Sequence, residues 1–380
     1  MRKVSQSTEI LVVGGGVAGI AASLSAAREG KKVLLAESTY MLGGLATSGL
    51  VAIYLPLDDG DGNQLSFSIA EELLKLAVSE GYENEFPTEW INKGSKEERI
   101  NHRYRAQFNP HVFAILCEKL LIKNNVKILY GVNANKVAIK DEKISSVNFV
   151  SRTQEIKIKT KVVIDTTGDA TICDIAGEKV VNCDHGNFVA CWYSEVINGE
   201  YQLRLKGTQD TDYYNNRGGN TFQGLEAKEL SKKTIESHQY ILKDFLKNGE
   251  SSTSHALATI ATIPQVRMTR RLVGKYELSI DDNKKKFDDS VGMFGNWIKR
   301  GYGFELPVRS LCGNKITNLF VGGRCISVKE LAMWDIARAI PVCAVSGEAC
   351  GVLSSLLVDD KLEIKNAQKI LVNRGVKLHY

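Results

Sequence analysis

The sequence predicts an α/β protein in which a parallel sheet is accompanied by an antiparallel meander and an inserted α+β region. Near the N-terminus, short aliphatic runs alternate with segments rich in alanine and leucine, and glycines separate them. The chain contains 33 Gly but only 6 Pro, which is typical of an α/β protein whose turns approach a ligand closely. Its 380 residues, 43% hydrophobic and 24% charged, exclude a disordered chain and can form a large core.

The charge and the cysteines exclude several classes of protein. The net charge is +5, and the densest basic run, residues 284–286, is flanked by acidic residues, so we expect no nucleic-acid surface. No apolar stretch approaches the roughly 18 to 20 residues that cross a bilayer. The eight cysteines show no C-x-x-C spacing, and no cluster has the spacing of metal ligands. We therefore expect a cytoplasmic protein with reduced thiols, no metal and no membrane partner. The sequence does not decide whether the protein forms a homo-oligomer.

The first 37 residues combine two strands, a helix and a glycine motif. Residues 9–13 predict a buried strand, because all of them after Glu9 are aliphatic, and residues 32–36 predict a second strand. Residues 17–29, between the two, predict a helix. The pattern G-x-G-x-x-G lies between the first strand and the helix, and an acidic residue follows the second strand. This order indicates a dinucleotide site, although a purely structural turn can also contain small residues.

Each position of the glycine motif has a physical role. The first glycine permits a tight turn, the second lets the backbone approach a pyrophosphate, and the third lets the helix pack against the strand. The helix N-terminus offers unpaired N–H groups and a positive dipole end, and Glu37 would accept hydrogen bonds from a ribose. On these residues alone, NAD and FAD both fit. The expected contacts are Gly14, Gly16, Val17, Ala18, Gly19, Glu37 and Ser38.

The next segment, residues 38–49, favours FAD. It reads STYMLGGLATSG, and a bound NAD does not need a second glycine pair here, whereas the longer FAD runs on past its pyrophosphate. The segment resembles the Leu-Gly-Gly-x-Ala-Thr-Ser-Gly stretch of FAD-dependent oxidoreductases with the glutathione-reductase-like Rossmann fold. The resemblance implies FAD contacts at Gly43, Gly44, Leu45, Ala46 and Thr47.

Three more segments resemble motifs of this family, in the family's order. Residues 161–170 are similar to its second flavin motif, residues 318–327 to its third motif, and residues 338–351 to its final helix. Pro341 suits the first turn of that helix, whose positive end would stabilise a reduced flavin. The resemblance therefore implies FAD as the cofactor. It implies further contacts at Val132, near the adenine, and at Thr167, Gly168, Asp169, Gly323, Arg324, Ile340 and Val342.

The remaining pattern predicts how the chain is divided. We expect residues 1–181 and 306–380 to form a discontinuous FAD-binding domain, and residues 182–305, which contain no flavin motif, to form an inserted substrate or cap domain. A tyrosine-rich turn is expected at Tyr213 and Tyr214. Other expected elements are helices at 66–80, 111–123 and 225–247, a strand at 126–129, and a meander at 136–139, 143–150 and 155–159.

Arginines are the main candidates for substrate contact, because they pair with anionic or carbonyl groups. Arg267 lies in an arginine-rich segment of the inserted region, Arg324 in the third motif and Arg338 just before the final helix. If the first of these segments is extended, Arg267 and Arg271 share one face and Arg270 lies on the other. The alternative is that these arginines are exposed or form salt bridges.

The resemblance implies an FAD-dependent oxidoreductase that transfers a hydride between a small organic substrate and the flavin. Two other functions stay open. A tRNA-modifying flavoprotein would need a basic platform, which the charge of +5 does not provide, and a non-enzymatic escort protein could reuse the fold. Many relatives carry a His-Glu pair after the third motif, whereas this chain has Glu330 without the His, so any mechanism through that His is in doubt. The sequence does not indicate the substrate or the electron acceptor.

Overall fold

A five-stranded parallel sheet forms the centre of the protein. The computed structural model describes residues 1–80, 86–207, 221–247 and 249–380. The strand order is β20-β10-β2-β3-β6, and every pairing is parallel, which confirms the predicted sheet. The strands are β2 (Ile10–Val13), β3 (Val33–Ala36), β6 (Lys127–Leu129), β10 (Val162–Asp165) and β20 (Leu319–Val321).

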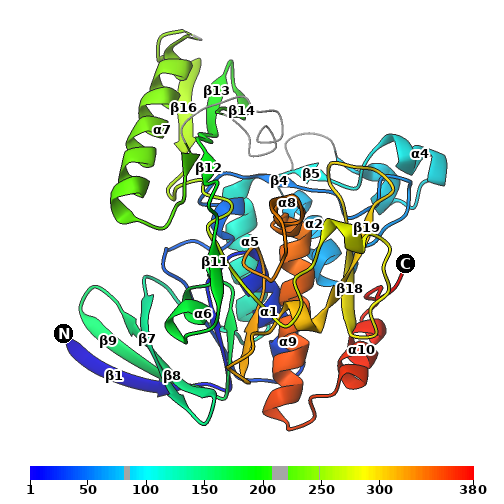
Figure 1. Cartoon of the computed structure of the whole chain (residues 1–380). Coiled ribbons are helices and arrows are strands. Elements are labelled where there is room, and N and C mark those ends of the chain that lie inside the picture. The colour runs from blue at the N-terminus through cyan, green and yellow to red at the C-terminus, as the bar shows by residue number, and fades with distance from the viewer. Residues whose placement is uncertain (81–85, 208–220, 248) are drawn as a thin grey trace.

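Both faces of this sheet are covered, which explains why its strands are largely aliphatic. Successive residues of a strand point to opposite faces. Ile10 and Val12 pack with the helices, whereas Leu11 and Val13 pack with a second sheet. The protein therefore has three layers, and Figure 1 shows the second sheet at the lower left of the helices.

Helices α1 (Val17–Arg28) and α9 (Ile340–Val358) of the helical layer pack unusually closely. A Cβ atom on Gly347 would overlap the carbonyl oxygen of Ala18, and one on Gly351 would lie 2.6 Å from the carbonyl oxygen of Ala22. Only glycine permits this approach, so the two helices can pack almost backbone to backbone. The helices of this layer are α1 (Val17–Arg28), α2 (Ile69–Ser79), α5 (Pro110–Lys123), α9 (Ile340–Val358) and α10 (Ile364–Asn373).

Helix α9 corrects one expectation. We expected no apolar stretch of membrane-spanning length. Helix α9, however, has 19 residues and is long and apolar enough to cross a membrane, judged by length and composition alone. It is the only such helix in the part of the chain that the structure describes. Within the protein, 89% of its apolar window is buried, because α1, α2 and α10 pack against it. Such burial is typical of a core helix.

The second sheet contains the predicted meander and one strand that we did not predict. Strands β7 (Asn133–Lys140), β8 (Lys143–Val150) and β9 (Gln154–Lys159) are antiparallel neighbours, which confirms the meander. Strand β1 (Arg2–Ser7) joins the sheet parallel to β9. Its sequence, RKVSQS, is polar and largely exposed, so it carries no hydrophobic alternation from which a strand can be predicted.

The inserted region contains a long helix that packs on a three-stranded sheet. Helix α7 (Ala227–Lys247) confirms the prediction for residues 225–247. The sheet has the order β14-β13-β16, from β13 (Tyr193–Ile197), β14 (Glu200–Arg204) and β16 (His255–Ile260). The predicted turn at Tyr213 and Tyr214 lies outside the described residues. A small separate core joins the helix to the sheet and contains Cys191, Tyr193, Ile241 and Phe245.

The later part of residues 182–305 packs differently. Leu278, Phe287 and Phe294 belong to the main hydrophobic core rather than to the small core under α7. The domain boundaries therefore stay a prediction.

The other elements are short. They are β4 (Ile53–Tyr54), α3 (Thr88–Ile91), α4 (Lys96–Asn101), β5 (Ala106–Gln107), α6 (Thr171–Ile175), β11 (Val180–Asn182), β12 (Asn187–Phe188), β15 (Thr221–Phe222), β17 (Arg270–Leu272), β18 (Ser290–Gly295), β19 (Gly303–Pro307) and α8 (Leu331–Ala337).

Candidate functional site

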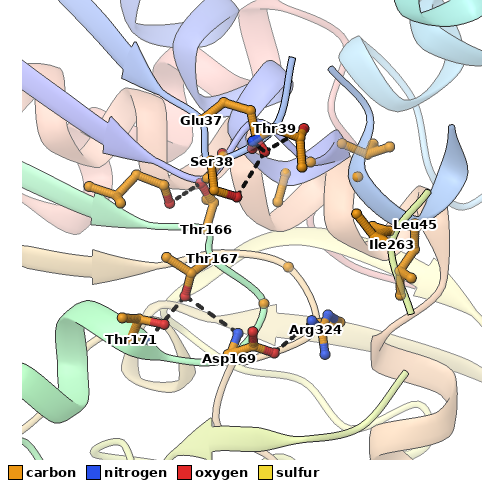
Figure 2. A pocket seen from close by; sticks show the side chains of 18 of the residues that line it. Glu37, Ser38, Thr39, Leu45, Thr166, Thr167, Asp169, Thr171, Ile263 and Arg324 are labelled. Carbon is orange, nitrogen blue, oxygen red and sulfur yellow. Dashed lines mark hydrogen bonds and ion pairs between the residues drawn. The ribbon is translucent and has the colours of Figure 1, made fainter. Parts of the chain in front are cut away.

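A cavity of about 390 Å³ opens where β2, β3, β10 and β20 end (Figure 2). In parallel α/β sheets, ligands bind at the carboxyl ends of the strands. Most of the residues predicted to hold FAD line this cavity. They are Gly14, Gly16, Val17, Ala18, Glu37, Ser38, Gly43, Gly44, Leu45, Ala46, Val132, Thr167, Gly168, Asp169, Gly323, Arg324 and Ile340.

Three predicted residues do not line the cavity but support residues that do. Gly19 lies behind the first turn, where a Cβ atom would overlap the carbonyl oxygen of Gly14. The hydroxyl of Thr47 donates a hydrogen bond to the carbonyl oxygen of Leu42, which closes the glycine loop. Val342 is 1% exposed in the main core. Gly19 and Val342 thus contribute to packing, and Thr47 contributes to the shape of the glycine loop.

The start of α1 provides an anion site. No side chain caps this helix, and its N-cap residue is Gly16. A Cβ atom on Gly16 would meet no other atom within 4 Å, so the space in front of the helix is open. Gly14 has a φ of +102°, and a Cβ atom there would overlap the backbone of Thr166. The uncapped N–H groups and the open space fit a pyrophosphate.

Glu37 has more hydrogen bonds than the sequence suggested. Its Oε1 accepts hydrogen bonds from the backbone N–H and the hydroxyl of Thr39, at 2.7 and 2.8 Å, and from the hydroxyl of Ser38 at 3.2 Å. Its Oε2 accepts one from the N–H of Gly15 at 2.6 Å. A carboxylate oxygen can accept about two, so Oε2 retains capacity for a ribose hydroxyl. Glu37 also holds the first turn to the end of β3.

The second turn is organised by a buried carboxylate. Asp165 ends β10, is fully buried, and accepts hydrogen bonds from the backbone N–H groups of Thr167, Ile172 and Cys173 at 2.8 to 3.0 Å. The hydroxyl of Thr167 donates a fourth at 2.7 Å. Burial raises the pKa of Asp165, although these hydrogen bonds oppose the shift. Asp165 thereby fixes the backbone of the turn that faces the cavity.

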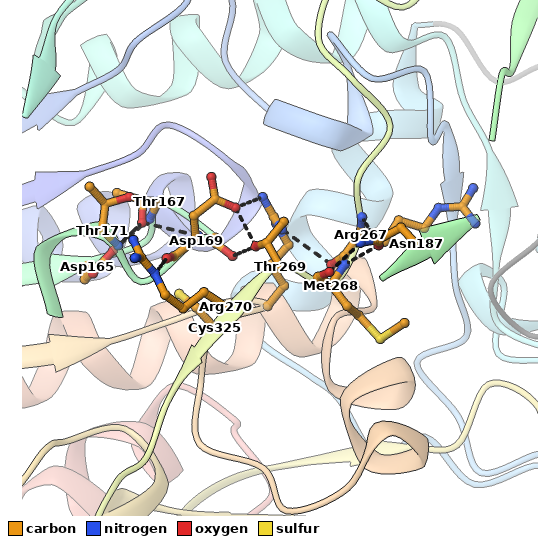
Figure 3. Close-up of polar contacts among 12 residues, drawn as sticks. Asp165, Thr167, Asp169, Thr171, Asn187, Arg267, Met268, Thr269, Arg270 and Cys325 are labelled. Atoms are coloured by element: carbon orange, nitrogen blue, oxygen red, sulfur yellow. Dashed lines mark hydrogen bonds and ion pairs between the residues drawn. The ribbon is translucent and has the colours of Figure 1, made fainter. Parts of the chain in front are cut away.

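Arg324 joins three distant segments at the cavity wall (Figure 2), and Figure 3 shows its partners Asp169 and Thr269 next to each other. Its Nη2 lies 2.7 Å from Oδ1 of Asp169, and its Nη1 donates to the hydroxyl of Thr269 at 3.0 Å. Thr269 also donates to Asp169 at 2.6 Å. A Cβ atom on Gly168 would overlap the guanidinium. The second motif, the third motif and the inserted region therefore meet at this cation.

This arrangement leads to a first prediction. Arg324→Ala removes one hydrogen bond to Asp169 and one to Thr269, which itself donates to Asp169. We therefore expect the dissociation constant of FAD to rise roughly tenfold, about 1.4 kcal/mol. Arg324→Lys keeps the charge but cannot bridge Asp169 and Thr269 together, and should recover only part of the affinity. Titration of the protein with FAD, followed by flavin fluorescence, measures both. Unchanged affinity in the alanine variant would contradict the role.

Arg338 lies where α9 begins. It lines the cavity together with Ile340 and Cys343, and Pro341 lies in the first turn of α9, as predicted. Nε of Arg338 donates to Oδ1 of Asp335 at 2.9 Å, and Nη2 donates to the same oxygen. Burial raises the pKa of the Cys343 thiol to about 12, so this cysteine is a neutral thiol beside the arginine.

Arg267 lies outside the cavity lining. It is 5% exposed, and its guanidinium stacks on Trp192 at 5.0 Å from the ring centroid. The segment is not the long extended strand that we considered, because only Arg270–Leu272 form β17. Arg270 pairs with Asp174 and Arg271 with Glu277. The structure therefore brings Arg324 and Arg338 to the cavity, but not Arg267.

Sequence reasoning missed several lining residues. Thr39, Thr166 and Thr171 follow strand ends or a motif, so their position in the sequence could have indicated them. The residues from the inserted region carry no local signal, because only tertiary packing brings them to the cavity. These are Gly224, Leu230, Ile263, Pro264, Val266 and Thr269.

Solved structures share this fold. The p-nitrophenol 4-monooxygenase PnpA of Pseudomonas putida DLL-E4 matches with a TM-score of 0.50 and 11% identity, over 98% of this chain and 84% of that chain. The Sdh1 complex of Mycobacterium smegmatis in its apo form matches with a TM-score of 0.50 and 11% identity, over 94% of this chain and 69% of that chain. At such low identity these matches show the fold alone.

Sequence comparison shows the family. A thioredoxin reductase of Ureaplasma parvum serovar 3 is 33% identical over 75 residues, which is 20% of this chain and 24% of that protein's length. The family profile described as FAD dependent oxidoreductase matches residues 9–188 and 181–373, which is nearly the whole chain. With the uncapped helix and the glycine cradle described above, we conclude that the chain belongs to the FAD-dependent oxidoreductase family and uses FAD as its cofactor.

Proposed function

We propose that the protein transfers a hydride between a small organic substrate and FAD. The observation that supports this most directly is the continuity of the cavity. It runs from the nucleotide-binding turns to an apolar wall, and Figure 2 displays Leu45 and Ile263 at that end. The wall residues Leu230, Ile263, Pro264 and Val266 come from the inserted region.

The side chains at this end divide the tasks. FAD supplies hydride transfer when it is bound. In our proposal the apolar wall packs on the substrate and excludes water, which strengthens polar interactions inside the site. Arg338 donates a hydrogen bond to a substrate oxygen, and Asp335 holds its guanidinium in place. The start of α9 adds positive potential.

The test is anaerobic reduction of the bound flavin by fractions of a metabolite pool, followed by loss of the visible flavin absorbance. With a substrate found, Arg338→Ala should lower the reduction rate by about 10²-fold or more, the usual effect of losing one oxyanion-type donor, while FAD stays bound. A matched control is Arg309→Ala, because Arg309 forms a similar pair with Asp289 at 3.0 Å outside the cavity lining. A protein that binds FAD but is reduced by no small molecule would contradict the proposal and favour an escort role.

A further inference from the structure

Helix α7 carries an apolar strip on the side that faces away from the protein. Ile235, Leu242 and Leu246 are 57%, 55% and 51% exposed. Positions separated by seven and eleven residues lie on one face of a helix, because each residue turns by about 100°. Figure 1 shows α7 at the edge of the molecule, far from α10. We call Ile235, Leu242 and Leu246 the outer strip.

The fold itself does not account for the outer strip. A different face of α7 already packs on the three-stranded sheet through Ile241 and Phe245, which are both 3% exposed. A helix needs one such apolar face to join a core. Isolated exposed apolar residues are ordinary, but a line of three long aliphatic side chains on one helix indicates a surface that is covered at times.

The charges around the outer strip are mostly positive. The residues of α7 that are charged and exposed are Lys228, Lys232, Lys243 and Lys247. The carboxylates of α7 are partly occupied elsewhere. Asp244 binds the hydroxyl of Tyr193 and the ammonium of Lys206, at 2.9 and 3.2 Å, and Glu229 accepts from the N–H groups of Gln223 and Gly224 at 2.8 and 2.7 Å.

This charge distribution indicates what kind of partner covers the outer strip. The remaining carboxylate of the helix, Glu236, lies 3.8 Å from Lys232, so the exposed rim of the strip is lysine-rich. A second copy of the chain that packed on the outer strip would bring one lysine-rich rim against another, which like-charge repulsion opposes. We propose that α7 docks the protein on an anionic lipid surface, with the outer strip among the acyl chains and the lysines at the headgroups.

The test is co-sedimentation of the FAD-loaded protein with vesicles. Vesicles of 70% phosphatidylcholine and 30% phosphatidylglycerol should bind the protein, and pure phosphatidylcholine vesicles should bind it far less. Lys243→Gln with Lys247→Gln should lower the partition coefficient about 25-fold, roughly fivefold for each lysine. Leu242→Gln with Leu246→Gln should abolish binding even at low salt, because the charges alone hold the protein weakly.

Matched controls come from α10 and the residues just before it. Lys365 and Lys369 of α10 are exposed and have the same spacing as Lys243 and Lys247. Val372 of α10 is 54% exposed, and Leu362, two residues before α10, is 37% exposed. Substituting these pairs by glutamine should leave vesicle binding unchanged. Failure of the protein to bind anionic vesicles would overturn the proposal, as would equal losses in the α10 variants. Light scattering tests for a dimer. If the protein were a dimer and the double substitution Leu242→Gln with Leu246→Gln dissociated it, the outer strip would bind a second copy of the chain instead. None of these outcomes depends on the reaction proposed above.

Discussion

Gly19→Ala is expected to abolish FAD binding and to lower the free energy of unfolding by about 3 kcal/mol or more, at the upper end of overpacking effects. The added Cβ atom would overlap the carbonyl oxygen of Gly14, and neither backbone segment can move without displacing β2 or α1. The first turn would shift away from the position that a pyrophosphate needs. Urea unfolding and the flavin absorbance of the purified protein measure the two effects.

Gly16→Ala is the matched comparison, because it places the same methyl group three residues earlier. Nothing lies within 4 Å of that position, and its φ of −66° suits alanine. Without FAD, the free energy of unfolding of this variant should therefore lie within about 0.5 kcal/mol of the wild-type value. FAD should bind at least about tenfold more weakly, because the methyl group enters the space proposed for the pyrophosphate. Unchanged FAD affinity in this variant would contradict the placement of the cofactor.

Asp165→Ala is expected to cost about 3 to 5 kcal/mol of unfolding free energy. The substitution leaves the buried N–H groups of Ile172 and Cys173 and the partly buried N–H of Thr167 without their acceptor, and each buried unsatisfied donor costs about 1 to 3 kcal/mol. The turn that carries Gly168 would lose its fixed geometry, so FAD affinity should fall as well. Thermal or denaturant unfolding with and without FAD measures both.

The control for this variant is Asp174, which lies on the short helix α6 together with Ile172 and Cys173. Asp174 is 46% exposed and pairs with Arg270 at 2.6 Å, so Asp174→Ala should cost no more than about 1 kcal/mol of unfolding free energy. The loss of unfolding free energy in Asp165→Asn should fall between the losses in these two variants. Its amide oxygen can still accept hydrogen bonds, but its amide nitrogen faces N–H donors and cannot. If Asp165→Ala were as stable as Asp174→Ala, the buried network would not organise the turn.

The sequence was most informative where function depends on adjacent residues. The strand, the glycine turn and the helix that surround Gly14 lie within a short segment, so local rules predict their geometry. The same holds for Thr167 and Gly168, which directly follow a strand. Most residues of the nucleotide end of the cavity could therefore be named from the sequence.

The substrate end depended on contacts that no local pattern encodes. Ile263 and Leu230 are far apart in the sequence and reach the cavity wall only through the packing of the inserted region. Arg267 was chosen for its residue type, but stacking on Trp192 turns it away from the wall. Strand β1 was missed because backbone pairing with β9 forms it, and not apolar side chains.

The close packing of α1 and α9 couples cofactor supply to the amount of folded protein. Since Gly347 meets Ala18 and Gly351 meets Ala22, the helices run parallel, and α9 begins about 9 Å ahead of α1 at 1.5 Å per residue. Two positive helix ends so near each other repel in the interior, and an anionic ligand relieves this electrostatic frustration. At free FAD of 100 times its dissociation constant, binding adds about 2.7 kcal/mol of stability. Flavin starvation would then deplete the protein itself as well as its activity.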